Sequence, residues 1–374
     1  MTYPDFFKTA TGEDHSPYGW QERLATSCTC ESRLIDIPTG LGKTAGVILA
    51  WLWNRLDVKD GQKSSWPRRL VYCLPMRTLV EQTECELAKW LQNLWKEGHS
   101  LGLSPAAVEE LRWLSGNGDT DKAYSPIILM GGEDLSTKKR EWDLYPERPA
   151  ILIGTQDMLL SRALNRGYGM SRYRWPMHFS LLNNDALWIM DEVQLMGSGL
   201  ETSAQMQGLR KSIGTTQICA TWWMSATVAP ERLKTPDFKS EHQNLSPLQL
   251  TSDEAAQPQT RERLHSKKTI HFSDLRLKET KVAEISVYAA AVADQVAQTH
   301  EQDSLTLVIL NRVDRAQTVF NALGMACPDI PCALIHSRFR PGDRAEHMKL
   351  IDHPKGGILV STQAIEAGLD ISAR

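Results

Sequence analysis

Short, mostly apolar runs alternate along the chain with longer segments in which apolar residues recur at helical spacing. Each run is followed by small, polar or charged residues, as expected of a buried strand that ends at a turn. The runs in the first part of the chain are residues 34–37, 70–74, 127–130, 151–153, 187–190 and 218–224. Because parallel strands need helical crossovers, this alternation predicts an α/β fold with a parallel sheet.

The alternation is interrupted between residues 229 and 265 and then resumes. Residues 240–262 are rich in Gln, Ser, Asp and Pro and lack periodicity, which is typical of a boundary between domains. We therefore expect two parallel-sheet lobes, residues 1–245 and 246–374. The strands predicted in the second lobe are residues 269–272, 305–310, 331–336 and 357–361, with helices at 282–298, 313–323 and 343–351.

The composition is that of an ordinary soluble protein. Of 374 residues, 41% are hydrophobic and 23% are charged, and no stretch of about 18 apolar residues predicts a membrane span. The N-terminus lacks the segments of a signal peptide, and the seven Cys residues lack metal-site spacing. These features favour a cytoplasmic protein without a membrane partner. With a net charge of −3, contact with nucleic acid is expected only in a local groove.

The segment DIPTGLGKT, residues 36–44, lies between the first predicted strand and a predicted helix at 45–54. Glycines permit a tight turn whose backbone N–H groups face phosphate oxygens, and a helix N-terminus favours the same anion. The lysine is expected to reach the β- and γ-phosphates of ATP, and the threonine hydroxyl to bind Mg²⁺. The predicted nucleotide-binding residues of this loop are Pro38, Thr39, Gly40, Leu41, Gly42, Lys43 and Thr44.

Two residues before this loop are candidates for recognition of the base. The Gln21 amide can bond both edges of an adenine, and the Tyr18 ring can stack on it. The alternative is that this segment only caps and packs a helix.

An acidic pair follows the apolar run at 187–190. Asp191 is expected to hold the Mg²⁺ shell, and Glu192 to orient or deprotonate the attacking water. Ser225 and Thr227, at the end of the next strand, are candidates to relay the state of the nucleotide. Helix capping is their alternative role and is compatible with the first.

Together these segments resemble a superfamily 2 helicase with two RecA-like lobes. The matching positions follow the order of the family and are Gln21, 38–44, 75–83, 154–157, 191–194, 225–227 and 361–370. The resemblance implies a P-loop NTPase fold in which 1–245 is the ATP-binding lobe and 246–374 the second helicase lobe. It also implies ATP and Mg²⁺ as cofactors.

Longer strings resemble the helicase portion of the CRISPR-associated helicase–nuclease of type I interference systems, with subtype I-U/I-G the nearest. They are LPMRTLVEQT (74–83), GTQDMLLSRALNRGYG (154–169), DEVQLMG (191–197), HSRF (336–339) and STQAIEAGLDIS (361–372). The resemblance implies an antiviral, ATP-driven motor that moves on single-stranded DNA, 3′ to 5′. Its partner would be an R-loop made by an RNA-guided surveillance complex.

The same resemblance implies site residues in both lobes. Candidates for contact with the DNA backbone, which positions a strand without reading its sequence, are Arg77, Thr78, Gln156, Thr362 and Gln363. Gly368 and Asp370 are expected to face the nucleotide across the cleft between the lobes. Gln194 stands where many relatives have His, so its part in coupling hydrolysis to nucleic acid is open.

Two features of that family are missing from the sequence. Its last helicase motif, which includes an arginine for the γ-phosphate, would lie beyond Arg374, so a truncated second lobe is expected. Its nuclease uses a His-Asp pair, and no His-Asp dipeptide occurs here. The nuclease is therefore expected in a missing C-terminal part or on a separate chain. Loss of such an arginine costs about 10³ to 10⁵ in rate, so we expect slow ATP hydrolysis even with DNA.

Two other functions stay open at this stage. One is a different superfamily 2 motor, such as an RNA helicase or a restriction-system translocase, which stimulation by DNA or RNA distinguishes. The other is a non-catalytic remnant that binds ATP or DNA, which predicts nucleotide binding without turnover.

Overall fold

The computed structural model describes residues 2–56, 66–97, 101–115, 126–131, 142–225, 230–239, 245, 247–265, 269–277, 282–336 and 338–362. The chain divides into two compact units, residues 1–266 and 267–374. Each unit has its own sheet and its own buried core.

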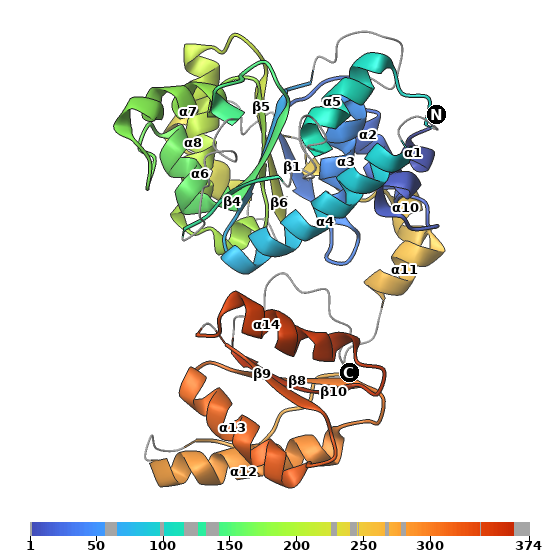
Figure 1. Ribbon diagram of the computed structural model, residues 1–374, viewed down its shortest axis with the longest axis vertical. Helices are drawn as coiled ribbons and strands as arrows, with labels where there is room; N and C mark the ends of the chain where they lie inside the picture. Colours follow the sequence, from blue (N-terminus) through green and yellow to red (C-terminus); the bar gives the residue numbers. More distant parts are fainter. Residues whose placement is uncertain are drawn as a thin grey trace. The chain divides into compact units, whose positions relative to one another are not determined.

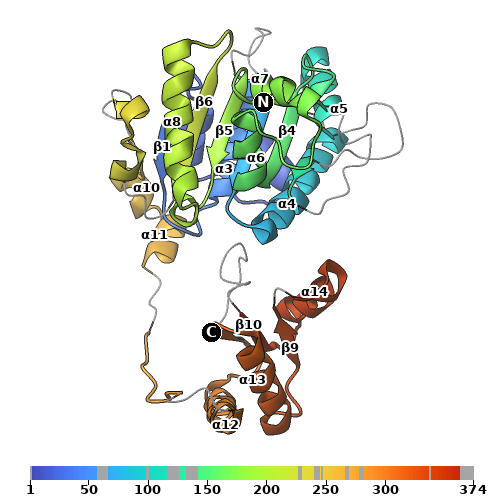
Figure 2. The same cartoon turned by 90° about the vertical axis from the view of Figure 1, so that its left-hand side faces the viewer.

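The first unit is built on a parallel sheet (Figures 1 and 2). In the sheet order β3-β4-β2-β5-β6-β1-β7, every neighbouring pair of strands is parallel. The strands are β1 (Arg33–Asp36), β2 (Arg69–Leu74), β3 (Ile127–Leu129), β4 (Ala150–Thr155), β5 (Ala186–Met190), β6 (Cys219–Ser225) and β7 (Pro247–Leu248). The predicted α/β fold is confirmed, and all carboxyl ends of these strands lie at one edge of the sheet.

Helices cover both faces of this sheet, so the unit has three layers (Figure 1). One layer contains α6 (Gln156–Ala163), α7 (Trp175–Leu182) and α8 (Ser198–Ile213). The opposite layer contains α1 (Tyr3–Thr11), α2 (Gly19–Ala25), α3 (Lys43–Arg55), α4 (Arg77–Glu97) and α5 (Pro105–Ser115). Short 3₁₀ turns are η2 (Arg172–Arg174), η3 (Val193–Leu195), η4 (Pro230–Leu233) and η5 (Pro236–Phe238).

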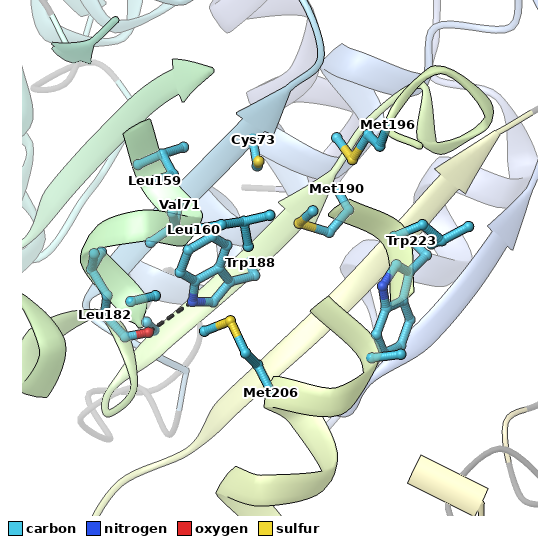
Figure 3. Close-up of a cluster of buried hydrophobic side chains, with 14 of the residues drawn as sticks. Val71, Cys73, Leu159, Leu160, Leu182, Trp188, Met190, Met196, Met206 and Trp223 are labelled. Carbon is cyan, nitrogen blue, oxygen red and sulfur yellow. Dashed lines mark hydrogen bonds between the residues drawn. The ribbon is translucent and has the colours of Figure 1, made fainter. Parts of the chain in front are cut away.

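Strand β5 is at the centre of the core beneath α6 and α8. Trp188 is 1% exposed, and its indole N–H donates to the Leu182 carbonyl at 2.8 Å (Figure 3). Leu159 of α6 and Met206 of α8 belong to the same apolar cluster. Burial of this surface fixes β5, and with it the position at which the acidic pair leaves the sheet.

The first unit extends beyond the boundary predicted at residue 245. Strand β7 pairs with β1, and α10 (Ser252–Ala256) and α11 (Pro258–Leu264) follow it in the same unit. Arg23 Nε donates to Glu254 at 2.8 Å, and Gln249 Nε2 donates to Asp36 at 2.7 Å. These bonds join residues 231 and 213 positions apart. Residues 240–262 have the local composition of a boundary between domains. Contacts between residues so far apart in the sequence leave no local pattern that would have indicated otherwise.

The second unit contains a smaller parallel sheet in the order β8-β10-β9. Its elements are α12 (Val282–Thr299), β8 (Leu305–Leu310), α13 (Val313–Ala326), β9 (Cys332–Ile335), α14 (Pro341–Met348), η6 (Lys349–Asp352) and β10 (Gly357–Thr362). Ile358 packs in the cluster of α12 and α13, whereas Leu359 packs with Met348 and Leu350. Since successive strand residues face opposite sides, helices cover both faces of this sheet as well.

The strand predicted at 269–272 is not formed. These residues have no regular secondary structure, and Ile270 and Phe272 are 77% and 96% exposed. A short apolar pattern makes a strand only beside a partner, and none of the described strands pairs with this segment. Among the helices that the structure describes, none is long and apolar enough to cross a membrane.

Candidate functional site

The carboxyl edge of the first sheet brings the predicted loop and acids together. The loop at 38–44 follows β1, Asp191 follows β5, and Ser225 ends β6. These three strands are neighbours in the order β5-β6-β1. Open α/β sheets bind ligands at this edge, so the site lies where the fold favours one.

The loop turns through two glycines in the left-handed region. Gly40 has φ +78° and Gly42 has φ +65°, and α3 begins at Lys43. A Cβ on Gly42 would lie 2.9 Å from Gln21 Nε2, so a larger residue would be strained and also crowded. The partly exposed N-terminus of α3 and the exposed glycines before it form a site suited to an anion.

Lys43 folds back over its own loop. Its ammonium donates to the carbonyls of Ile37 at 3.1 Å and Pro38 at 3.5 Å. Burial lowers the pKa of Lys43, and the charges of Glu192 and Asp191 partly oppose this. The lysine therefore lies within electrostatic reach of the acidic pair.

The Gln21 side chain is 1% exposed and clamps the phosphate loop. Its Nε2 donates to the Gly42 carbonyl at 2.8 Å, and its Oε1 accepts from the Tyr18 N–H at 2.8 Å. Trp20 Nε1 also donates to the Leu41 carbonyl at 3.2 Å. The capping and packing alternative thus describes this segment, and adenine recognition by Tyr18 and Gln21 stays a prediction.

A buried tyrosine lies beside both residues predicted to bind metal. The Tyr72 hydroxyl donates to Asp191 Oδ2 at 2.6 Å, and the Thr44 side chain lies close enough to lower the pKa of Tyr72 against the larger effect of burial. Asp191 is 6% exposed, and burial raises its pKa to about 6 although the Tyr72 bond lowers it. Tyr72 was not predicted from the sequence; the one indication was a hydroxyl within the otherwise apolar part of β2.

Glu192 has a strained backbone, with φ +51° and ψ +46°. Its N–H donates to Asp191 Oδ1 at 2.9 Å, so the backbone of Glu192 helps to fix the orientation of the Asp191 carboxylate. A non-glycine residue in this conformation costs about 1 to 3 kcal/mol, and such residues cluster at functional sites.

A hydrogen-bond chain joins the end of β6 to Glu192. The Ser225 hydroxyl donates to Gln194 Oε1 at 2.6 Å, and Gln194 Nε2 donates to Glu192 at 2.5 Å. The structure thus brings together three predicted site residues from two strands. Thr227 lies outside the described residues.

The donor set at Thr44 and Asp191 fits Mg²⁺. A hydroxyl and a carboxylate are hard oxygen ligands, and one buried tyrosine donates to the carboxylate and lies beside the hydroxyl. Among the described residues, no group of three or more His, Cys, Asp or Glu forms a metal cluster. Mg²⁺ does not need one, because it usually binds one or two protein ligands together with phosphates and water.

The predicted nucleic-acid residues occupy separate places. Arg77 and Thr78 begin α4 after β2, and Gln156 begins α6 after the neighbouring β4. Arg77 donates to the Gly131 carbonyl. In the second unit, Thr362 ends β10 and is 8% exposed. Gln363, Gly368 and Asp370 lie outside the described residues.

Comparison with solved structures identifies proteins with the same fold. Helicase Lhr of Mycobacterium smegmatis, bound to ssDNA and AMP-PNP, has 17% identity and a TM-score of 0.59 over 99% of this chain and 42% of Lhr. Mss116p, bound to ssRNA and AMP-PNP, has 15% identity and a TM-score of 0.56 over 98% of this chain and 64% of Mss116p. The DUF1998 helicase MrfA, bound to DNA and AMPPNP, has 15% identity and a TM-score of 0.57 over 98% of this chain and 45% of MrfA. The chain therefore spans less than two thirds of each of them.

Sequence comparison gives two family matches and no match among curated proteins. The C-terminal family of the CRISPR-associated nuclease/helicase Cas3 matches residues 302–374. The DEAD/DEAH box helicase family matches residues 20–235. The predicted resemblance to a Cas3-like superfamily 2 helicase is confirmed by these matches. Since the second covers more than half of the sequence, this chain belongs to the DEAD/DEAH box helicase family.

Proposed function

We propose that the chain is the ATP-driven motor part of a CRISPR type I helicase, and that its first unit binds and hydrolyses ATP. The observation that supports this most directly is the meeting of phosphate loop, acidic pair and Ser225 at one sheet edge. Lhr, Mss116p and MrfA were solved with AMP-PNP, which agrees with a nucleotide at this loop.

The loop would bind phosphates by exchanging its internal contacts for charged ones. Lys43 now donates to two neutral carbonyls, Ile37 and Pro38. A phosphate adds attraction between opposite charges to the hydrogen bond, so it would displace these carbonyls from Lys43. The N-terminus of α3 would add its N–H groups to the same anion.

The two carboxylates of the acidic pair would have different roles, metal binding for Asp191 and activation of water for Glu192. Thr44 and Asp191 would hold Mg²⁺, which neutralises phosphate charge when bound. Glu192 would orient the attacking water and accept its proton. The bond from Gln194 would keep the Glu192 carboxylate in place, and Ser225 would connect it to β6.

Single-stranded DNA is the proposed track. The Cas3-like match favours DNA, and Lhr and MrfA were solved with DNA, although Mss116p was solved with RNA. Arg77 and Gln156 follow adjacent strands and would hold the backbone of the strand. Thr78, Thr362 and Gln363 would add contacts, and Gly368 and Asp370 would face the nucleotide. Movement 3′ to 5′ from an R-loop of a surveillance complex, in antiviral defence, completes the proposal.

Nucleotide binding and hydrolysis test this function. Binding of a fluorescent ATP analogue and release of phosphate would be measured without nucleic acid, with single-stranded DNA, and with RNA of the same sequence. We expect Lys43→Ala to lose binding, and Glu192→Gln to bind normally but hydrolyse ATP at least about 100-fold more slowly. Lys96→Ala is the control, because Lys96 is exposed near the far end of α4.

The outcomes separate the alternatives. Failure of the wild-type chain to bind nucleotide would refute the proposal. Stimulation by RNA rather than DNA would favour a different superfamily 2 motor. Binding without turnover under every condition would favour a remnant that binds nucleotide without hydrolysing it.

A further inference from the structure

We propose that Tyr72 is a positioning residue that holds Asp191, beside Thr44, in the orientation in which it accepts Mg²⁺. This inference rests on the proposed function, because it concerns the metal that accompanies the nucleotide. Tyr72 belongs to β2, which contributes no residue to the predicted ATP site. Its hydroxyl nevertheless donates to one predicted metal ligand, Asp191, and the other, Thr44, lies close enough to lower its pKa.

The direction of the hydrogen bond follows from the chemistry of the groups. A carboxylate only accepts, so Tyr72 donates its single hydroxyl proton to Asp191 Oδ2. With this proton used, the tyrosine oxygen has only lone pairs to offer the nearby Thr44 hydroxyl. Tyr72 therefore does not occupy the Thr44 lone pairs, which stay available to a cation.

The Asp191 carboxylate is fixed at both oxygens. Oδ2 accepts from Tyr72, and Oδ1 accepts from the Glu192 N–H at 2.9 Å. Two carboxylate oxygens offer about four acceptor positions, so capacity for a cation remains. Because the group is already held, a metal would not need to order it, and the cost of binding is reduced.

Tyr72 is itself held by the sheet rather than by a loop. Strand β2 lies between β4 and β5, where Tyr72 pairs with Ile153 and Ile189. Its side chain is 0% exposed. A phenylalanine would fill the same space and need no hydrogen-bond partner, so packing alone does not explain the hydroxyl. The hydrogen bond to Asp191 does explain it.

Tyr72→Phe removes this hydroxyl and keeps the ring. The binding of a fluorescent ADP analogue would be followed by anisotropy while Mg²⁺ is titrated, so the measurement does not depend on hydrolysis. We expect the half-saturating Mg²⁺ concentration to rise about 10-fold, as is typical when a group behind a metal ligand is lost. Binding in the presence of EDTA should be unchanged.

Tyr3→Phe is the matched control. Tyr3 is 3% exposed, and its hydroxyl has no hydrogen-bond partner in the part of the chain that the structure describes. The same chemical deletion there should leave the Mg²⁺ requirement unchanged. Thermal unfolding of both variants would verify that each has folded.

An unchanged Mg²⁺ requirement in Tyr72→Phe, beside Mg²⁺-dependent binding by the wild-type chain, would overturn the role of Tyr72 and leave the proposed function intact. An equal loss of binding with Mg²⁺ and with EDTA would also overturn it, because that pattern indicates a structural role only. No binding by the wild-type chain would overturn the proposed function, and this inference with it.

Discussion

Two buried aspartates in the first unit show how surroundings give one residue type opposite roles. Asp143 and Asp191 are 3% and 6% exposed. Asp143 is paired with two basic side chains, whereas Asp191 is held by the Tyr72 hydroxyl and a backbone N–H. The fold itself neutralises the first carboxylate. The second retains a charge that a ligand cation can neutralise.

Asp143 attaches its own segment to α7. Arg174 Nε donates to its carboxylate at 2.9 Å, and His178 Nε2 lies 2.8 Å from it. Burial raises the pKa of Asp143, but the hydrogen bonds from His178 and Arg174 outweigh this and lower it. Every charge in this cluster has an opposite charge beside it, so its effect is expected in stability rather than in chemistry.

Asp191 has the opposite balance. Burial raises its pKa to about 6, and the neighbouring Glu192 charge acts in the same direction. At neutral pH the protein therefore holds a buried negative charge at a cost in stability. A perturbed pKa beside a specific set of partners is common at functional sites.

The largest effect on stability is expected at the neutralised aspartate. Asp143→Asn removes the negative charge between Arg174 and His178, and loss of one member of a buried ion pair costs about 3 kcal/mol. The free energy of unfolding would be measured with urea. Nucleotide binding per folded molecule should be unchanged.

Asp14→Asn is the control for this exchange, because Asp14 is exposed. Its free energy of unfolding should change by less than about 0.5 kcal/mol. If both variants were as stable as the wild-type chain, Asp143 would not be a structural charge pair, and the contrast with Asp191 would fail.

Asp191→Asn should act in the opposite direction at neutral pH. With a pKa of about 6 folded and 3.8 unfolded, Asp191 keeps its proton in the folded state between about pH 4 and 6. Stability is therefore lost as pH rises through this window, by about 3 kcal/mol at most. Since a buried amide also has a cost, we expect the variant to gain about 2 kcal/mol at pH 7.5.

Urea unfolding from pH 7.5 to 4.5 measures this gain, which should shrink as the pH falls. Asp143→Asn is the matched comparison. Because the pKa of the Asp143 carboxyl is lowered in the folded wild-type chain, the loss of stability in this variant should persist until the pH falls below about 4. A variant Asp191→Asn that is less stable than the wild-type chain at every pH would contradict the assignment of a costly buried charge.

The local parts of the site were predictable from the sequence. The phosphate loop and the acidic pair are short segments, and contiguous apolar runs at 34–37 and 187–190 place them at strand ends. Parallel pairing then brings these ends together. Sequence therefore predicted which segments meet, because each segment has its own local pattern.

Contacts between distant segments were not predictable in the same way. Tyr72 reaches Asp191 only because β2 lies beside β5, and the two residues are 119 positions apart. Strand β7 has two residues, too few for a periodic pattern, so residues 240–262 were interpreted as a boundary between domains. The Asp143 cluster was missed for the same reason, since Arg174 and His178 follow it by 31 and 35 positions.

The smallest effect is expected at an exposed contact of the phosphate loop. There, solvent weakens electrostatic interactions, whereas the two aspartates lie in the interior. Arg263 of α11 donates to the Gly40 carbonyl at 2.9 Å. Exposed contacts of this kind are worth about 0.5 kcal/mol, so Arg263→Gln should barely change the free energy of unfolding. Loss of a positive charge beside the loop should weaken binding of a fluorescent ATP analogue about 2-fold at low salt, and less at about 1 M salt.

Arg261→Gln separates this local effect from a change in net charge. Arg261 is also exposed and lies two residues earlier on α11, on a different side of the helix. If the two variants weakened nucleotide binding equally, only net charge would matter, and the contact with Gly40 would have no part in the site. If Arg263→Gln alone has an effect that salt suppresses, surface charge acts on the loop weakly and through solvent. The buried Asp191 would then differ from it in strength as well as in position.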